Sequence, residues 1–172
     1  MTLDLEHLLK NAQLSMESQP FGVSFDVLPE DFPVGASKEK LKTSISILLA
    51  WSLDRGFIDN EAAESTQELQ KALGLASNRK ASPLELLNII HDKFLPCYLQ
   101  ADVRGFLVGY YWPGWIYRYD VDFDNVFVAE YKSPILVPPG YLTRWDVPAT
   151  WVEAEKMFPI IDQRFSEWKN AK

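Results

Sequence analysis

The stretch ASKEKLKTSISILLAWSLDRGFI, residues 36–58, decides the fold of this chain. Its apolar residues recur at the three- and four-residue spacing of an α-helix, and further apolar residues cover the opposite side. Ser37 is a suitable N-cap, and Gly56 suits the position just past the C-terminus. We therefore expect a central, buried helix over residues 38–55. Its main face carries Leu41, Ile45, Leu48, Leu49 and Ser52, widened by Ile47, Trp51 and Leu53.

Shorter helices are predicted on both sides of the central one. Asp59 or Asn60 caps a mostly polar and therefore peripheral helix, and Ser82 before Pro83 marks the start of another. Pro159 lies inside the last helix, which it should kink or split. The expected helical ranges are 2–14, 61–75, 83–94, 101–111 and 150–170.

Two segments lack the helical spacing. Alternating apolar residues predict a short strand at 21–28, and residues 123–137 combine a strand-like run with prolines. The length of 172 residues is usual for one domain. We expect a single, mainly α-helical domain over residues 1–172, with a small β or extended component that adds an α+β character.

The stretch YYWPGWIYRYDVDFD, residues 110–124, combines many aromatic residues with three alternating aspartates. Read as an extended segment, it has two faces, because successive side chains of a strand point to opposite sides. We expect the inner face to pack in the core and the aspartates of the outer face to meet a partner. The inner face carries Tyr117, Tyr119, Val121 and Phe123, and the outer face carries Ile116, Arg118, Asp120, Asp122 and Asp124.

The three aspartates also match the opening of a calcium-binding loop. Such a loop needs Gly at its sixth position and Glu at its twelfth, but Asn125 and Tyr131 stand there. We therefore interpret the segment as an acidic turn or strand edge and predict no metal site.

No other motif points to a particular chemistry. The only histidines, His7 and His91, are far apart, and His91 late in a predicted helix suits the helix dipole. Cys97, in the apolar setting LPCYL, is interpreted as a small buried hydrophobe. Neither a G-x-S-x-G turn nor a phosphate-binding glycine loop is present. We expect no cofactor and no enzymatic activity, although 24 acids keep open a carboxylate pair that acts on a sugar or small polar substrate.

The charge of the chain favours a basic protein partner. The net charge is −7, and residues 54–68 and 118–130 each hold several acids and a single arginine. An acidic surface repels the phosphate backbone of nucleic acids and speeds the encounter with a basic protein.

Several features indicate a cytoplasmic protein that does not enter a membrane. No apolar run approaches the roughly 18 residues that cross a bilayer. The start, MTLDLEHLLK, carries acids where a secretory signal carries basic residues. The single cysteine cannot form an internal disulfide, which suits a reducing compartment.

Four stretches carry a resemblance: LLAWSLDRGFI, SPLELLNIIHDKF, GFLVGYY and YRYDVDF. Together they resemble a family of small uncharacterised bacterial proteins that are treated as immunity proteins of polymorphic toxin systems. The matching elements are residues 51–56, 92–93, 106–111 and 117–120, within a match over about residues 41–123. The glycine that the family places between residues 92 and 93 is missing.

The resemblance implies an immunity protein that binds and occludes a cognate toxin domain. Carboxylates would meet Lys and Arg around the toxin's active site, with aromatic anchors at the centre. An acidic adaptor or structural module for another basic partner is the main alternative. The expected partner-binding residues are Trp112, Trp115, Asp120, Asp122, Asp124, Asp59, Glu61 and Glu64.

Overall fold

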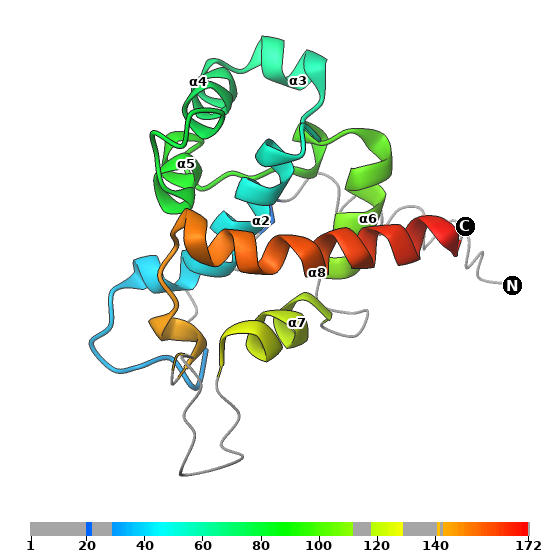
Figure 1. Ribbon diagram of the computed structural model, residues 1–172. Helices are drawn as coiled ribbons and strands as arrows, with labels where there is room; N and C mark the ends of the chain where they lie inside the picture. Colours follow the sequence, from blue (N-terminus) through cyan, green and yellow to red (C-terminus); the bar gives the residue numbers. More distant parts are fainter. Residues whose placement is uncertain (1–19, 22–28, 112–117, 129–140, 142, 172) are drawn as a thin grey trace, which may run out of the picture.

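The computed structural model describes residues 20–21, 29–111, 118–128, 141 and 143–171 (Figure 1). Helices dominate this part of the chain, which contains only two isolated β-bridges, Ile58 with Leu99 and Val128 with Tyr141. The mainly α-helical fold class is therefore confirmed. The elements are η1 (Lys38–Lys42), α2 (Thr43–Asp54), α3 (Asn60–Ser65), α4 (Gln67–Ala76), α5 (Pro83–Ile89), η2 (Pro96–Tyr98), α6 (Ala101–Tyr111), α7 (Arg118–Phe127), η3 (Arg144–Asp146) and α8 (Trp151–Asn170).

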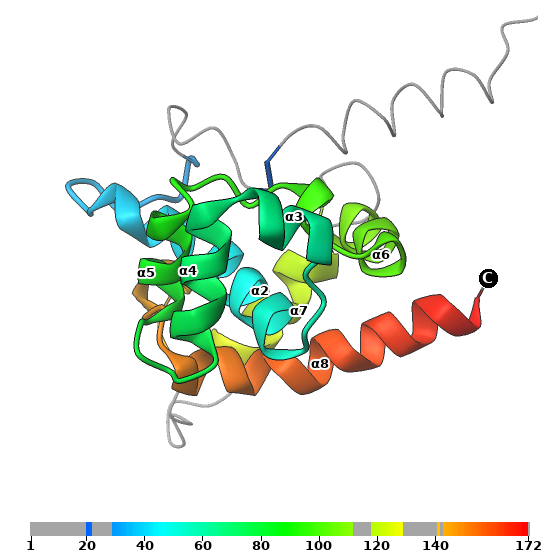
Figure 2. The same cartoon turned by 90° about the horizontal axis from the view of Figure 1, so that it is seen from above.

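Helix α2 is the centre of the fold, as its sequence predicts. Figure 2 shows it in the middle of a ring formed by α3, α4, α5, α6 and α8. A helix that is apolar on all sides has no face that it can leave in water, so other helices must surround it. Its two buried serines donate to carbonyls of their own helix, Ser46 to Thr43 at 2.8 Å and Ser52 to Leu48 at 3.0 Å. The buried hydroxyl groups are thus satisfied without any partner from another element.

The predicted ends of the central helix are confirmed. The Ser37 hydroxyl accepts a hydrogen bond from the backbone N–H of Glu39, and the first turns are the 3-10 helix η1. Gly56, just past the C-cap residue Arg55, adopts a φ of +67°. This left-handed conformation suits glycine because it has no Cβ.

The predicted helix over residues 61–75 consists of two helices. Thr66 separates α3 from α4 with an extended backbone, at φ −126° and ψ 104°. Asp59 caps α3 by accepting a hydrogen bond from the N–H of Ala62 at 3.1 Å, as predicted. No residue of α3 is buried, and α4 buries only Leu69, Ala72 and Ala76. Both helices are therefore peripheral.

Helix α5 begins where predicted but ends early. Ser82 and Glu85 form a capping box around the first turn. The helix was expected to reach residue 94, yet it ends at Ile89, because His91 and Asp92 adopt positive φ angles of 53° and 60°. The prediction of His91 inside a helix is therefore wrong. Cys97, expected to be buried, is exposed.

The prediction of an extended segment around residue 120 is wrong, because residues 118–127 form helix α7. Tyr119, Phe123 and Phe127 are spaced by four residues, which places all three on one helical face, and all are at most 2% exposed. The core positions predicted for Tyr119 and Phe123 are confirmed. Val121, predicted to face inward, is instead 53% exposed, and Asp122, predicted to face outward, is buried at 6%. The error follows from using a period of two residues where the helical period applies.

Helix α8 runs unbroken from Trp151 to Asn170, so Pro159, which was predicted to kink or split it, does not split it. Pro159 lies on the exposed side of the helix, where a carbonyl that loses its helical donor remains accessible to water. Thr150 caps the helix, as predicted, by accepting a hydrogen bond from the N–H of Glu153. The buried side of α8 packs against α2 with Ala154, Met157, Phe158 and Ile161.

Several predictions lie outside the described residues. These are the helix at 2–14, Tyr117, most of the strand at 21–28, and the part of the segment 123–137 that follows α7. Within the described residues, no helix is both long enough and apolar enough to cross a bilayer.

The aromatic face of α7 predicts a graded response at one position. Tyr119→Ala should lower the free energy of unfolding by about 3 to 5 kcal/mol, because it empties a large buried volume. Tyr119→Phe should lower it by only about 1 kcal/mol, because it removes only the hydrogen bond from the Tyr119 hydroxyl to the Ser44 carbonyl (2.7 Å). Urea unfolding measures both. The exposed neighbour is the control: Val121→Ala should stay within about 0.5 kcal/mol, and a larger loss would contradict this packing.

Candidate functional site

The acidic residues of α7, expected to form a binding surface, each pair with a residue of the same chain. Asp122 accepts two hydrogen bonds from Arg164 of α8, one from Nε and one from Nη2, both at 2.9 Å. The hydroxyl of Tyr110 in α6 donates a third, at 2.8 Å. A paired guanidinium and carboxylate with both oxygens engaged is a strong, directional contact. Asp122 is thus buried and joins α6, α7 and α8.

Asp120 and Asp124, one helical turn apart on α7, share the guanidinium of Arg144 in η3. Arg144 Nη1 lies 3.5 Å from Asp120, and Nη2 donates to Asp124. Burial would lower the pKa of Arg144, but its hydrogen bond to Asp124 and the two negative charges outweigh burial and raise that pKa. The pKa of Asp120 is raised, chiefly because burial disfavours its charged form and also because Asp124 repels it. These two aspartates are therefore largely committed to η3.

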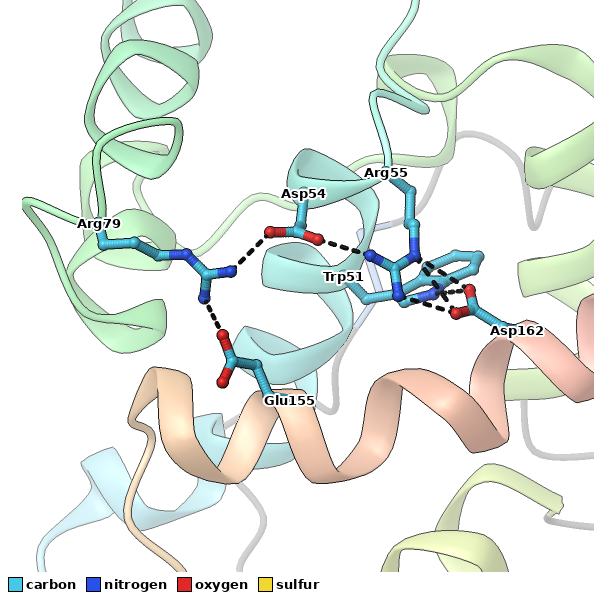
Figure 3. A network of polar contacts seen from close by, with 6 residues as sticks. All are labelled: Trp51, Asp54, Arg55, Arg79, Glu155 and Asp162. Atoms are coloured by element: carbon cyan, nitrogen blue, oxygen red, sulfur yellow. Dashed lines mark hydrogen bonds and ion pairs between the residues drawn. The ribbon is translucent and has the colours of Figure 1, made fainter.

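A network of alternating charges joins α2 to its neighbours (Figure 3). Asp54 at the end of α2 lies between Arg55, at 2.7 Å, and Arg79 of the turn after α4, at 2.9 Å. Arg79 also pairs with Glu155 of α8 at 2.9 Å, and its guanidinium lies 3.9 Å from the centre of the Trp151 ring. Such stacking adds a cation–π attraction to the ion pairs.

The other end of the same network closes on Asp162 of α8. Its carboxylate accepts hydrogen bonds from Trp51 Nε1 and Arg55 Nη2, both at 2.8 Å (Figure 3). Burial would raise the pKa of Asp162, but the hydrogen bonds from Arg55 and Trp51 outweigh it and lower that pKa. The buried indole of α2 thus has its polar atom satisfied at the surface of α8.

The second buried carboxylate of the described residues, Glu153, is also an acceptor of internal bonds. It accepts from Tyr141 at 3.0 Å, from Lys156 at 3.1 Å and from the hydroxyl of Thr150. Burial would raise its pKa, but these donors outweigh burial and lower it. Glu153 therefore secures Tyr141 and the first turn of α8.

The acids of α3 and the start of α4 differ from all of these. Asp59 is engaged in its cap, but Glu61, Glu64 and Glu68 are exposed and form no ion pair with any residue that the structure describes. Residues 56–70 contain no Lys or Arg, so the local sequence offers no neutralising charge. Among the predicted site residues, Glu61 and Glu64 are the carboxylates that have no bond to another residue of the described part of the chain. Glu68 belongs to the acidic run of residues 54–68 but is not one of the predicted site residues.

The two expected aromatic anchors, Trp112 and Trp115, lie outside the described residues. Within the described part of the chain, no group of three or more His, Cys, Asp or Glu residues is arranged to hold a metal ion.

Comparison with known protein families, curated proteins and solved structures finds no match to this chain.

The buried pair of α7 and α8 yields a stability prediction. Asp122→Asn should lower the free energy of unfolding by roughly 3 kcal/mol, because it leaves the Arg164 guanidinium without its buried counter-charge. The control is Glu167→Gln on the other side of the same guanidinium, where the Glu167 side chain is 45% exposed. That exchange should cost less than about 0.5 kcal/mol. Urea unfolding measures both variants. Equal losses of unfolding free energy would contradict a larger contribution from the buried pair.

The raised pKa of Asp120 predicts how stability changes with pH. The folded chain binds the proton of the Asp120 carboxyl more tightly than the unfolded chain does. Ionisation of Asp120 therefore costs stability as the pH rises from the ordinary pKa of 3.8 through the raised pKa of the folded chain. Asp120→Asn should therefore be more stable than the natural chain at neutral pH, and the difference should shrink on acidification. Urea unfolding across this pH range measures it.

Asp146 provides a control of opposite sign. Its pKa is lowered, chiefly by the hydrogen bond from the Thr143 side chain, so its ionisation adds stability that is lost as pH falls through the lowered value. Asp146→Asn should be less stable than the natural chain at neutral pH, with a difference that also shrinks on acidification. The same sign for both variants would contradict these assignments.

Proposed function

We propose that this chain is an immunity-type binding protein, which occludes a basic toxin domain through the free carboxylates of α3 and α4. The observation that carries the proposal is the division of the acidic residues. Most acids of α2, α7 and α8 described above bind arginines of the same chain, and Glu153 binds Tyr141, Thr150 and Lys156. In contrast, Glu61, Glu64 and Glu68 have no ion-pair partner among the described residues.

The physical reason is that a carboxylate already paired with an internal arginine has little remaining attraction for a partner. Taking Asp122 for binding would break a buried pair and leave Arg164 with only its exposed partner, Glu167. Binding through Glu61 or Glu64 breaks no bond between these carboxylates and any residue that the structure describes. The negative charge of such carboxylates is also not neutralised by a neighbouring cation, and this raises the rate of encounter with a positively charged surface.

The position of α3 supports this assignment. Figure 1 shows α3 and α4 on the opposite side of α8 from α7. Because α3 has no buried residue, a partner can cover it without displacing the core. The resemblance of residues 41–123 to immunity proteins adds the class of partner, a toxin domain with Lys and Arg around its active site. An acidic adaptor that binds another basic protein would use the same face.

The free carboxylates predict a salt-dependent effect on binding. The partner to test is a toxin domain, sought first in the neighbouring genes. Glu61→Gln/Glu64→Gln should slow association with it by about tenfold at low salt. The gap should narrow as salt rises, because ions screen exposed charges. The matched control is Glu30→Gln/Glu39→Gln, which removes the same charge at exposed positions outside this face. Stopped-flow or biosensor kinetics measure both pairs.

Three outcomes separate the possibilities. Equal slowing by the two double variants would show that only net charge matters, and the α3–α4 face would lose its role. If the neighbouring gene encodes no toxin and co-expression protects cells from none, the immunity function fails. Capture from the native host of a basic protein that is not a toxin, lost in Glu61→Gln/Glu64→Gln, would instead establish the adaptor function.

A further inference from the structure

The three residues of η3 each make contact with a different part of the protein. Arg144 pairs with Asp120 and Asp124 of α7. Trp145 contacts the segment 29–36, and Asp146 lies 3.5 Å from Lys40 of η1. A short element that touches three others is suited to transmit a change from one to another.

The segment 29–36 is shaped by its own turns. The N–H of Phe32 donates to the Pro29 carbonyl at 3.0 Å, and the N–H of Ala36 donates to that of Pro33 at 3.1 Å. In the second turn Gly35 adopts a φ of +79°, which suits a residue without a Cβ. These bonds set the conformation of the segment but do not attach it to the rest of the protein.

Trp145 provides the attachment. Its ring meets the ring of Phe32 edge to face, with centroids 5.2 Å apart, and its Nε1 donates to Asp31 at 3.2 Å. Among the described residues, these are the ring contact and the side-chain hydrogen bond that join segment 29–36 to another element, and the charge of Arg144 also attracts Asp31. Phe32 is 9% exposed in this arrangement, so loss of the contact would bring an aromatic ring into water.

Arg144 lies beside Trp145. The two residues are adjacent in a three-residue helix, and the Arg144 guanidinium lies 5.9 Å from the centre of the Trp145 ring. The side chains of Arg144, Asp120 and Asp124 are between 28% and 42% exposed. The pair is therefore partly accessible to dissolved ions, unlike the buried pair of Asp122.

We propose that η3 is a strap that couples α7 to segment 29–36. While Arg144 is paired with Asp120 and Asp124, Trp145 is held where it docks Phe32 and the segment is closed. When those ion pairs break, segment 29–36 detaches and uncovers the rings of Phe32 and Trp145, while α2, α5 and α8 remain folded. High ionic strength therefore favours the open form. This device is independent of the α3–α4 face and of the function proposed for it.

Hydrogen exchange of the full-length chain, followed by mass spectrometry, tests the strap. The amides of Phe32 and Ala36 report on segment 29–36, because they are hydrogen-bonded in its turns. Arg144→Gln should speed exchange in this segment by about fivefold or more, a change on the order of 1 kcal/mol, without speeding exchange in α2 or α5. The matched control is Lys40→Gln, which removes the exposed contact of η3 with η1 and should change little.

Two further measurements do not depend on Arg144→Gln alone. In the natural chain, exchange of segment 29–36 should rise with salt, and in Arg144→Gln it should not. Trp145→Ala should open the segment to at least the same degree, and Arg144→Gln should add little in the double variant, because only the weaker attraction of Arg144 for Asp31 remains to be lost. Unchanged exchange in Arg144→Gln, an equal increase in α2 and α5, or exchange in the natural chain that does not depend on salt would each overturn the proposal.

Discussion

The burial of α2 on all sides is the constraint from which the rest of the structure follows. A helix with apolar residues around its whole circumference must be enclosed, and α4, α5 and α8 pack directly on it. Its polar atoms are then satisfied either within the helix, by Ser46 and Ser52, or at the edge of α8, where Asp162 receives the indole N–H of Trp51. Enclosure of one helix thus determines the layout of its neighbours.

Charge in this protein has two separate roles. Arg55, Arg79, Arg144 and Arg164 each bind carboxylates and join helices that are distant in sequence. Among the described residues, no arginine pairs with the carboxylates of α3 and the start of α4. An acidic run in a sequence therefore does not by itself mark a binding surface, because internal pairing can consume it. The α3–α4 face differs because its carboxylates form no ion pair with a described residue. Only the tertiary structure reveals this difference.

Local signals in the sequence were accurate where the physics is local. The caps at Ser37, Asp59, Ser82 and Thr150 were all confirmed, because a cap depends on a side chain and a backbone N–H a few residues away. Predictions that needed distant partners failed. Arg164 is 42 residues from Asp122, and no local pattern connects them. The failure at α7 has the same origin, because alternation and helical spacing both fit its aromatic residues until the neighbouring helices select one face.

The sequence by itself determined the mainly α-helical fold, the central helix and where most helices start, because these depend on the spacing of apolar residues and on caps. Only the tertiary structure decided which acids remain free. Asp120, Asp122 and Asp124 looked equivalent in the sequence, yet the first and third share Arg144 and the second is buried against Arg164. The physical reason is that the role of a charge depends on what lies within a few ångströms of it, and those neighbours come from distant parts of the chain.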